Sequence, residues 1–167
     1  MSSKNLIAEI EFEKTSTQKL LERLPEDKLG WRPHPKAMTL GQLAIHVATI
    51  PGRIATFAND GKTTAEILVA HPLSENKKDI LNSFDESIKT AIEILNASDS
   101  DWDSKNWTCT LDGQQIIDWP RPTLLRFLMV NHWCHHRGQL SAYLKMLNVA
   151  IPSIYGPSAD ENPFVKP

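Results

Sequence analysis

Two histidines near the end of the chain have the spacing of a metal-binding pair. His132 and His136 are four residues apart within the stretch from Asn131 to Gln139. On a helix with about 100° per residue they lie about 40° and one turn apart, where two imidazoles can bind one metal ion. Leu125 and Leu128 fall on the same face, so we expect the pair to point inward. Unpaired nitrogens there would cost roughly 1 to 3 kcal/mol each, a penalty that a metal removes.

A third histidine can complete the site. His46 lies beside Leu43 and Ile50 on another apolar helical face, which makes it the natural third ligand. Three histidines leave one or more coordination positions for water or substrate, the arrangement of a catalytic rather than a structural ion. Each histidine alone would be read as an ordinary core residue, but their combination favours one divalent metal ion.

The remaining histidines and the nearby cysteine are weaker candidates. No glutamate follows His132, so the sequence lacks the HExxH motif and a metalloprotease is disfavoured. His135 could replace one ligand or support the site from outside it. Cys134 points about 200° away from His132, which argues against it as a ligand. His34 and His71 are next to prolines in loops and are expected at the surface.

Four polar residues are candidates for substrate contact or for support of the ligands. Gln139 shares the arc of His132 and could orient a water or ligand, or simply bond to a neighbouring helix. Glu13 and Thr17 fall on the apolar stripe of the first helix, where they either line a polar pocket or mark the edge of the stripe. Arg53 is the fourth candidate. The sequence alone does not identify the catalytic residue among them.

The pattern of apolar residues predicts an all-α fold, a four-helix bundle with a small hairpin-like excursion near 107–119. Asp112-Gly113 is the tight-turn signal of that excursion. The four helices are expected at 5–24, from 40 after a Thr39 cap with a kink or break at Pro51-Gly52, from a Ser74 cap to 95, and at 122–147.

Length and composition indicate one soluble globular domain, 1–167. The chain is 41% hydrophobic and 23% charged, with a net charge of −2 and scattered Lys and Arg, so we expect no nucleic-acid partner. The longest apolar run, 124–130, is far shorter than the roughly 20 residues that span a bilayer. Without a signal peptide the protein is expected to be cytoplasmic, with no membrane partner. Cys109 and Cys134 are expected to be free thiols.

Several motifs together resemble the DinB-like family. His132 to Gln139, followed by Ser141–Leu144, Val149–Pro152 and Tyr155–Glu161, is similar to the end of these proteins, and Leu40–His46 is similar to their second-helix ligand motif. The resemblance covers nearly the whole chain. It implies an up-up-down-down four-helix bundle with a long crossover between helices two and three, often a homodimer. It also implies one nickel, zinc or iron ion held by His46, His132 and His136.

The same resemblance implies a metal-dependent hydrolase or thiol S-transferase acting on a small-molecule substrate. The ion would activate a water or a low-molecular-weight thiol, the latter as co-substrate. Two alternatives stay open: a non-catalytic metal-binding or stress-associated scaffold, and a helical dimerisation module with vestigial histidines. The tail either packs over one end of the bundle or helps to close the pocket through Tyr155 and Asp160.

Overall fold

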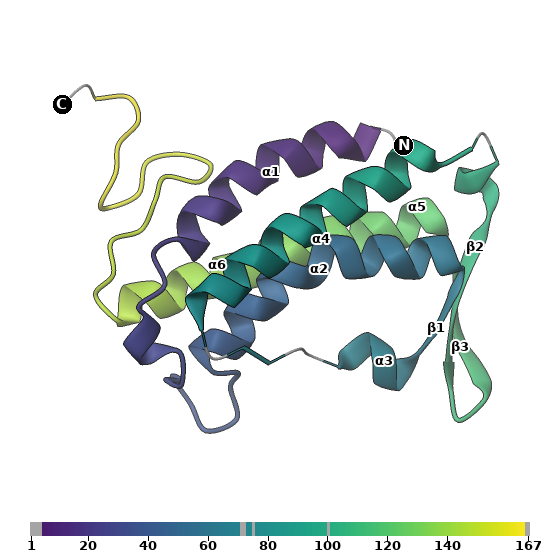
Figure 1. The fold of residues 1–167 in the computed structure, drawn as a ribbon, viewed down its shortest axis with the longest axis horizontal. Coiled ribbons are helices and arrows are strands. Elements are labelled where there is room, and N and C mark those ends of the chain that lie inside the picture. Colours follow the sequence, from purple (N-terminus) through teal and green to yellow (C-terminus); the bar gives the residue numbers. More distant parts are fainter. Residues whose placement is uncertain (1–4, 71–72, 75, 100, 166–167) are drawn as a thin grey trace.

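The computed structural model describes residues 5–70, 73–74, 76–99 and 101–165. Within them four long helical segments lie side by side, with a small sheet at one end (Figure 1). The long segments are α1 (Asn5–Leu21), α2 (Leu40–Asp60), α4 (Lys77–Ala97) and a last segment made of α5 (Arg121–Leu124), η3 (Leu125–Asn131) and α6 (His132–Met146). Shorter helical turns are η1 (Glu26–Lys28), α3 (Ala65–Val69) and η2 (Trp102–Ser104).

Contacts at the helix ends fix the directions of α1, α2 and α4. At the start of α2, a Cβ added to Gly41 would lie 2.9 Å from the Ser74 carbonyl oxygen, just before α4 begins. The end of α1 also meets the start of α4, where Lys77 Nζ donates to the carbonyl of Glu22. Therefore α2 and α4 run in the same direction, and α1 runs in the opposite one (Figure 1).

The last helical segment runs parallel to α1. Just beyond the end of α6, the Ala150 carbonyl accepts a hydrogen bond of 2.9 Å from Arg23, which follows α1. The order is therefore up-down-down-up, and the expected up-up-down-down order is wrong. The long connection falls between α2 and α4, as expected, because two consecutive parallel helices can be joined only by a chain that returns along their length. That connection carries β1 and α3.

Local signals define most of α2. Thr39 caps the helix in a capping box, with Thr39 Oγ1 accepting from Gln42 N and Gln42 Oε1 accepting from Thr39 N. The sequence predicts a kink or a break at Pro51. The break is wrong, because α2 continues through Pro51, but the helix is bent (Figure 1). Gly52 N donates to Ser87 Oγ at 2.8 Å, so a side chain of α4 supplies an acceptor at this irregular turn.

Two other helix ends differ from the expected ones. The first helix ends at Leu21, not at Leu24, although Leu24 is still buried against the core. The cap of α4 is Asn76, whose side chain accepts from Asp79 N at 2.9 Å, and not Ser74. Ser74 instead bonds to the backbone of Asn76. These shifts of a few residues leave the apolar faces of both helices where the periodicity predicts them.

The last helical segment contains a π-helical stretch, η3, that the periodicity does not predict. It occupies the seven residues before His132. A π turn inserts an extra residue into the helical repeat and so rotates the helix after it relative to the helix before it. Regular α geometry resumes at His132, so both histidines of the pair lie on α6, after the π-helical stretch.

The expected hairpin is confirmed, and it belongs to a three-stranded sheet that makes the all-α prediction incomplete. The sheet order is β1-β2-β3, with β1 parallel and β3 antiparallel to β2. At the turn, Asp112 has φ of 49° and Gly113 has φ of 77°, the left-handed pair that a two-residue hairpin needs. The strands are β1 (Lys62–Thr64), β2 (Asn106–Leu111) and β3 (Gln114–Pro120).

Arg121, which directly follows β3, connects the sheet to the end of α2. Its guanidinium donates to the carbonyl of Asn59 at 2.9 Å and lies 4.8 Å from the ring centre of Trp102. Burial lowers the pKa of Arg121, but not enough to remove the charge of a guanidinium. The connection is reinforced where Thr108 N donates to the carbonyl of Gly61.

The core lies between the helices, where small residues allow α2 to approach α4 closely. Ala44, Ala48, Ala55 and Ala58 are fully buried on α2, and Ala91 is fully buried on α4. None of the described helices is both long and apolar enough to cross a membrane.

Gly52→Ala is expected to lower the free energy of unfolding by about 1–3 kcal/mol. An added Cβ would lie 2.8 Å from the carbonyl oxygen of Ser87 and 2.9 Å from its Cα, so α2 and α4 would have to separate. Gly138→Ala is the control, because no atom lies within 4 Å of its added Cβ. It should stabilise by about 0.5 kcal/mol. Urea unfolding measures both, and equal effects would contradict the close approach.

Candidate metal centre

The three predicted histidines meet at the contact between α2 and α6. His46 lies in the first third of α2 and is 5% exposed, while His132 and His136 are half-buried on the first turns of α6. One ring nitrogen of each lies within 4.8 Å of the other two. The Nε2 atoms of His46 and His132 are 3.1 Å apart, although 86 positions separate the residues in sequence.

The geometry fits one small divalent ion. Two imidazole nitrogens bound at about 2.0–2.1 Å to one ion in tetrahedral or octahedral geometry lie about 2.9–3.4 Å apart. The distance of 3.1 Å between His46 and His132 falls in that range. The three rings are nearly perpendicular in pairs, with interplanar angles of 79–86° and centroids 4.3–5.2 Å apart. The rings therefore converge instead of stacking, as ligands around one point must.

Gln139 holds His136 in its orientation. Gln139 Oε1 lies 2.7 Å from Nδ1 of His136, one turn earlier on α6. With Nδ1 donating to the amide oxygen, the opposite ring nitrogen Nε2 is the one that can bind a metal. The partner of Gln139 is thus a histidine on its own helix, and its expected role in orienting a water or ligand stays a prediction.

A cavity of about 320 Å³ opens beside the histidines. Apart from the imidazoles and Arg53 its walls are aliphatic, and they come from α2, from η3 and from the short helix α3. The aliphatic residues are Ile50, Ile54, Leu68, Val69 and Leu128. Leu68 and Val69 were not predicted, because their place at the site depends on how the long connection folds back onto α2.

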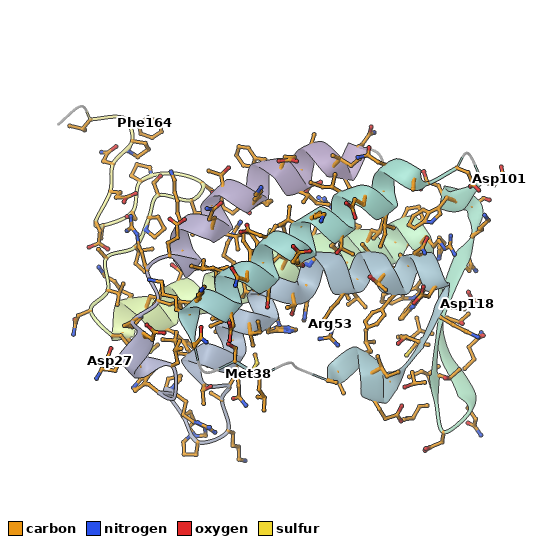
Figure 2. The ribbon with its side chains drawn as sticks, viewed as in Figure 1. Asp27, Met38, Arg53, Asp101, Asp118 and Phe164 are labelled. Atoms are coloured by element: carbon orange, nitrogen blue, oxygen red, sulfur yellow. The ribbon has the colours of Figure 1, made fainter. Side chains whose placement is uncertain are left out.

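Arg53 is the charged residue of this cavity. Figure 2 shows its side chain projecting from α2 into the space beside α3, where its guanidinium donates to the carbonyl of Ile67 at 2.9 Å. It also lies 5.7 Å from the ring centre of Phe57. Partial burial lowers the pKa of Arg53, yet a guanidinium stays charged at neutral pH. The prediction of Arg53 as a candidate substrate contact is consistent with this position.

The other candidate ligands lie outside the set of three. His135 is exposed, with its ring 5.0 Å from that of His136, and it does not join the ligand atoms. Cys134 faces away, as predicted, and its thiol lies 3.2 Å from Tyr155 Oη. His34 is exposed in its loop. His71 lies outside the described residues.

Glu13 and Thr17 line a second polar centre, on another face of α6. Glu13 forms an ion pair of 2.5 Å with Arg137, and both side chains are almost completely buried. Thr17 Oγ1 accepts from Arg137 at 3.2 Å and donates to the carbonyl of Glu13. Glu13 and Thr17 therefore face Arg137 in a buried polar cluster, and they line neither the histidine site nor the cavity beside it.

The tail after α6 docks on this second centre. Tyr155 Oη donates to Glu13 at 2.9 Å and accepts from Arg137, and burial together with the contacts to Cys134 and Glu13 raises the pKa of Tyr155. Asp160 accepts from a backbone N–H and pairs with Lys145, which hold the pKa of its carboxyl below its usual range. The idea that Tyr155 and Asp160 close the metal pocket is therefore wrong.

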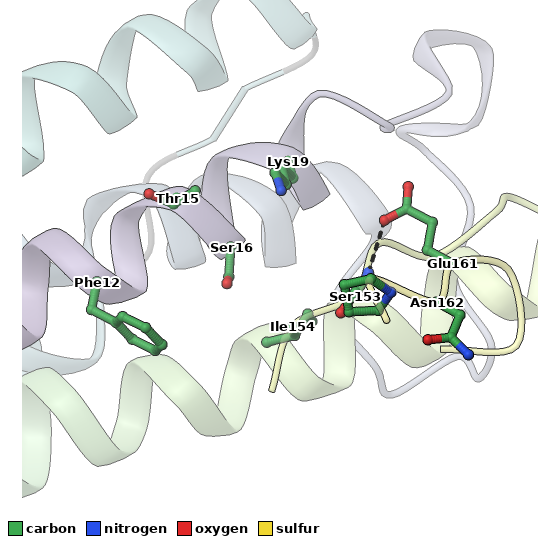
Figure 3. Close-up of a pocket in the computed structure, with 9 residues that line it drawn as sticks. Phe12, Thr15, Ser16, Lys19, Ser153, Ile154, Glu161 and Asn162 are labelled. Atoms are coloured by element: carbon green, nitrogen blue, oxygen red, sulfur yellow. Dashed lines mark hydrogen bonds between the residues drawn. The ribbon is translucent and has the colours of Figure 1, made fainter. Parts of the chain in front are cut away.

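A larger cavity of about 550 Å³ remains where the tail crosses α1 (Figure 3). Phe12, Ser16 and Lys19 face it from α1, and Glu161 accepts from Ser153 N on the side of the tail. Its lining contains no histidine and no cysteine among the described residues. We therefore place the candidate chemistry in the smaller cavity.

Together these features describe a helical protein with three histidines that could hold a metal ion beside an apolar cavity. Comparison with known proteins gives the family. The chain matches the DinB family over residues 1–163, and it therefore belongs to that family.

Three individual proteins illustrate the similarity. An uncharacterized Bacillus subtilis (strain 168) protein, YrdA, is 29% identical over 151 residues, covering 90% of this chain and 86% of that protein. A DinB-like protein from Bacillus cereus ATCC 10987 has a similar crystal structure, with a TM-score of 0.66, 25% identity and coverage of 86% and 91% of the two chains. The DinB-like YjoA of Bacillus subtilis shares the fold, with a TM-score of 0.69, 18% identity and coverage of 90% and 97%.

Gln139→Leu is expected to weaken zinc binding by about tenfold or more, because His136 loses the partner that fixes its ring. Gln139→Glu keeps an acceptor at the same position and should bind zinc within a few-fold of the natural protein. Competition with a fluorescent chelator measures both affinities. Equal affinities for the natural protein and the leucine variant would show that Gln139 does not hold His136.

Glu13→Ala is expected to lower the free energy of unfolding by about 3–5 kcal/mol, because Arg137 would be left buried without its carboxylate. Glu9→Ala is the matched control on the same helix. Glu9 pairs with Arg126 near the surface, and its loss should cost less than about 1 kcal/mol. Denaturant unfolding of both variants gives the comparison. Similar costs would contradict the distinction between the two ion pairs.

Proposed function

We propose that the protein is a metal-dependent enzyme of the DinB family, in which one divalent ion on His46, His132 and His136 activates a thiol or water. The reaction would be transfer of the thiol to a small substrate, or hydrolysis of that substrate. Nickel, zinc and iron all bind imidazole nitrogen. The observation that carries the proposal is the convergence of three ring nitrogens beside an apolar cavity.

The donor set supports an open coordination position. No Asp, Glu, Cys or further His joins the three histidines in the described part of the chain. Catalytic zinc sites commonly use three protein ligands and leave the next position for water or substrate, whereas structural sites are closed by a fourth. A divalent ion in such a site lowers the pKa of a bound thiol or water and so supplies a nucleophile at neutral pH.

The residues around the three histidines position these ligands and form the walls of the cavity. Gln139 orients His136, and the packing of α2 against α6 brings His46 to the other two. The aliphatic walls offer water few polar partners, which would strengthen electrostatic interactions inside the cavity. Among the described residues that line it there is no Asp or Glu to act as a general base. This supports a nucleophile that is activated by the ion instead of by a carboxylate.

A non-catalytic metal-binding scaffold is the alternative. It is favoured by the position of the histidines at the contact of two helices, because an ion there would also tie α2 to α6. A scaffold predicts that chelation lowers the melting temperature while the protein accelerates no thiol reaction. The enzyme predicts the same loss of stability together with a metal-dependent rate.

The first test is the metal content of untagged protein, measured by mass spectrometry. We expect a near-stoichiometric divalent metal in the natural protein and its loss in a His132→Ala, His136→Ala double variant. His135→Ala is the matched control, because His135 adjoins His136 in sequence but lies outside the ligand set. Equal metal contents in the double variant and the control would overturn the site.

The second test separates the enzyme from the scaffold. The metal-loaded protein is mixed with a low-molecular-weight thiol and 1-chloro-2,4-dinitrobenzene, where a carbon–sulfur bond forms, chloride leaves and the thiol proton passes to solvent. We expect the protein-dependent rate to persist at pH values where the free thiol is protonated, and to vanish in His46→Ala. A water nucleophile would instead appear as hydrolysis of an activated ester with the same metal dependence. Absence of both rates in metal-loaded protein would favour the scaffold.

A further inference from the structure

The cavity beside the three histidines is lined by aliphatic side chains and by one charged side chain. Five aliphatic side chains line it, and a single guanidinium, that of Arg53, accompanies them at the end away from His46 on α2. Its volume of about 320 Å³ is at the low end of small-molecule sites. A site of this type takes most of its binding energy from apolar contact, and its few polar groups determine which ligand is accepted.

Arg53 is held by one hydrogen bond, and its guanidinium has further N–H donors for a ligand. One of its nitrogens donates to the Ile67 carbonyl, which leaves further N–H groups of the same guanidinium for other acceptors. No carboxylate of a described residue lies within ion-pair distance of it. A partly buried guanidinium that has no carboxylate partner among the residues described in the structure favours a ligand that brings its own negative charge.

The spacing along α2 gives the length of that ligand. His46, Ile50 and Arg53 follow each other at steps of four and three residues, so they share one face of the helix. Seven residues at a rise of 1.5 Å place Arg53 about 10 Å along the axis from His46. A molecule that reaches from the histidines to the guanidinium therefore needs an apolar body several carbons long between its two polar ends.

We propose that the substrate of this site is a small molecule with an aliphatic body and a terminal carboxylate, and that Arg53 binds the carboxylate. The other end of the molecule lies toward the histidines, between Ile50 and Leu128. The assignment rests on the proposed function for the claim that this end reacts. The binding of the carboxylate does not depend on it, so the two can fail separately.

The test compares three ligands that share one chain, hexanoate, hexan-1-ol and hexylamine, by isothermal titration calorimetry. Each is titrated into the zinc-loaded and the metal-free protein at pH 8, above the ordinary pKa of a histidine side chain. The variants are Arg53→Gln, which removes the charge, and Arg53→Lys, which keeps it without the planar fork. Arg126→Gln is the control, because Arg126 is an exposed arginine that does not line the cavity. Thermal unfolding confirms that each variant is folded.

We expect the natural protein to bind hexanoate about tenfold or more tightly than hexan-1-ol, with hexylamine weakest. Arg53→Gln should abolish the preference for hexanoate, Arg53→Lys should keep part of it, and Arg126→Gln should leave it unchanged. Equal binding of hexanoate and hexan-1-ol, or a preference that survives Arg53→Gln, would overturn the proposal. If Arg53→Gln kept the preference for hexanoate in its zinc-loaded form alone, the carboxylate would bind the metal and not Arg53. An Arg53-dependent preference in protein that binds none of zinc, nickel and iron would uphold the carboxylate site and reject the metal enzyme.

Discussion

The approach of α2 to α6 at the histidine nitrogens is the constraint on which the rest of the structure depends. Imidazoles are costly to bring together in an apolar interior unless a proton or a metal is shared between them. The 3.1 Å contact between His46 and His132 is possible only because α2 lies deep between its neighbours. Small residues on α2, and the bond from Gly52 to Ser87, bring its backbone close to α4. The site is thus built by helix packing, not by a loop.

The last helical segment carries two polar centres with different tasks. One face presents His132 and His136 to α2, and another presents Arg137 to α1 and the tail. The buried ion pair of Arg137 with Glu13 lies next in sequence to a metal-ligand candidate, so it fixes the rotation of α6 about its own axis. Such a pair adds little net stability compared with an apolar contact, but it penalises every arrangement in which the charges separate. Its role is best understood as registry between α1 and α6.

Features that depend on residues close in sequence could be predicted, and those that depend on distant partners could not. The four-residue spacing of His132 and His136 and the Asp112-Gly113 turn are local patterns, and both lead to the observed structure. The strand β1 has three residues and forms only by pairing with β2, so no periodicity reveals it. Glu13 was visible as a polar residue on an apolar stripe, but its partner is 124 positions away. The up-down-down-up order of the helices depends on contacts between helix ends that are far apart in sequence, so no local pattern contains it.

The bend in α2 lies between two residues of the candidate site. His46 lies before Pro51 and Arg53 lies after it, so the irregular turn separates the candidate metal ligand from the candidate carboxylate contact. Proline removes one backbone hydrogen bond there, and a helix weakened in this way can change its angle at low cost. Ser87 counters that freedom, because its hydroxyl accepts the next backbone N–H and anchors the turn to α4. Ser87 does not line the cavity, yet its hydroxyl stabilises the turn that lies between His46 and Arg53.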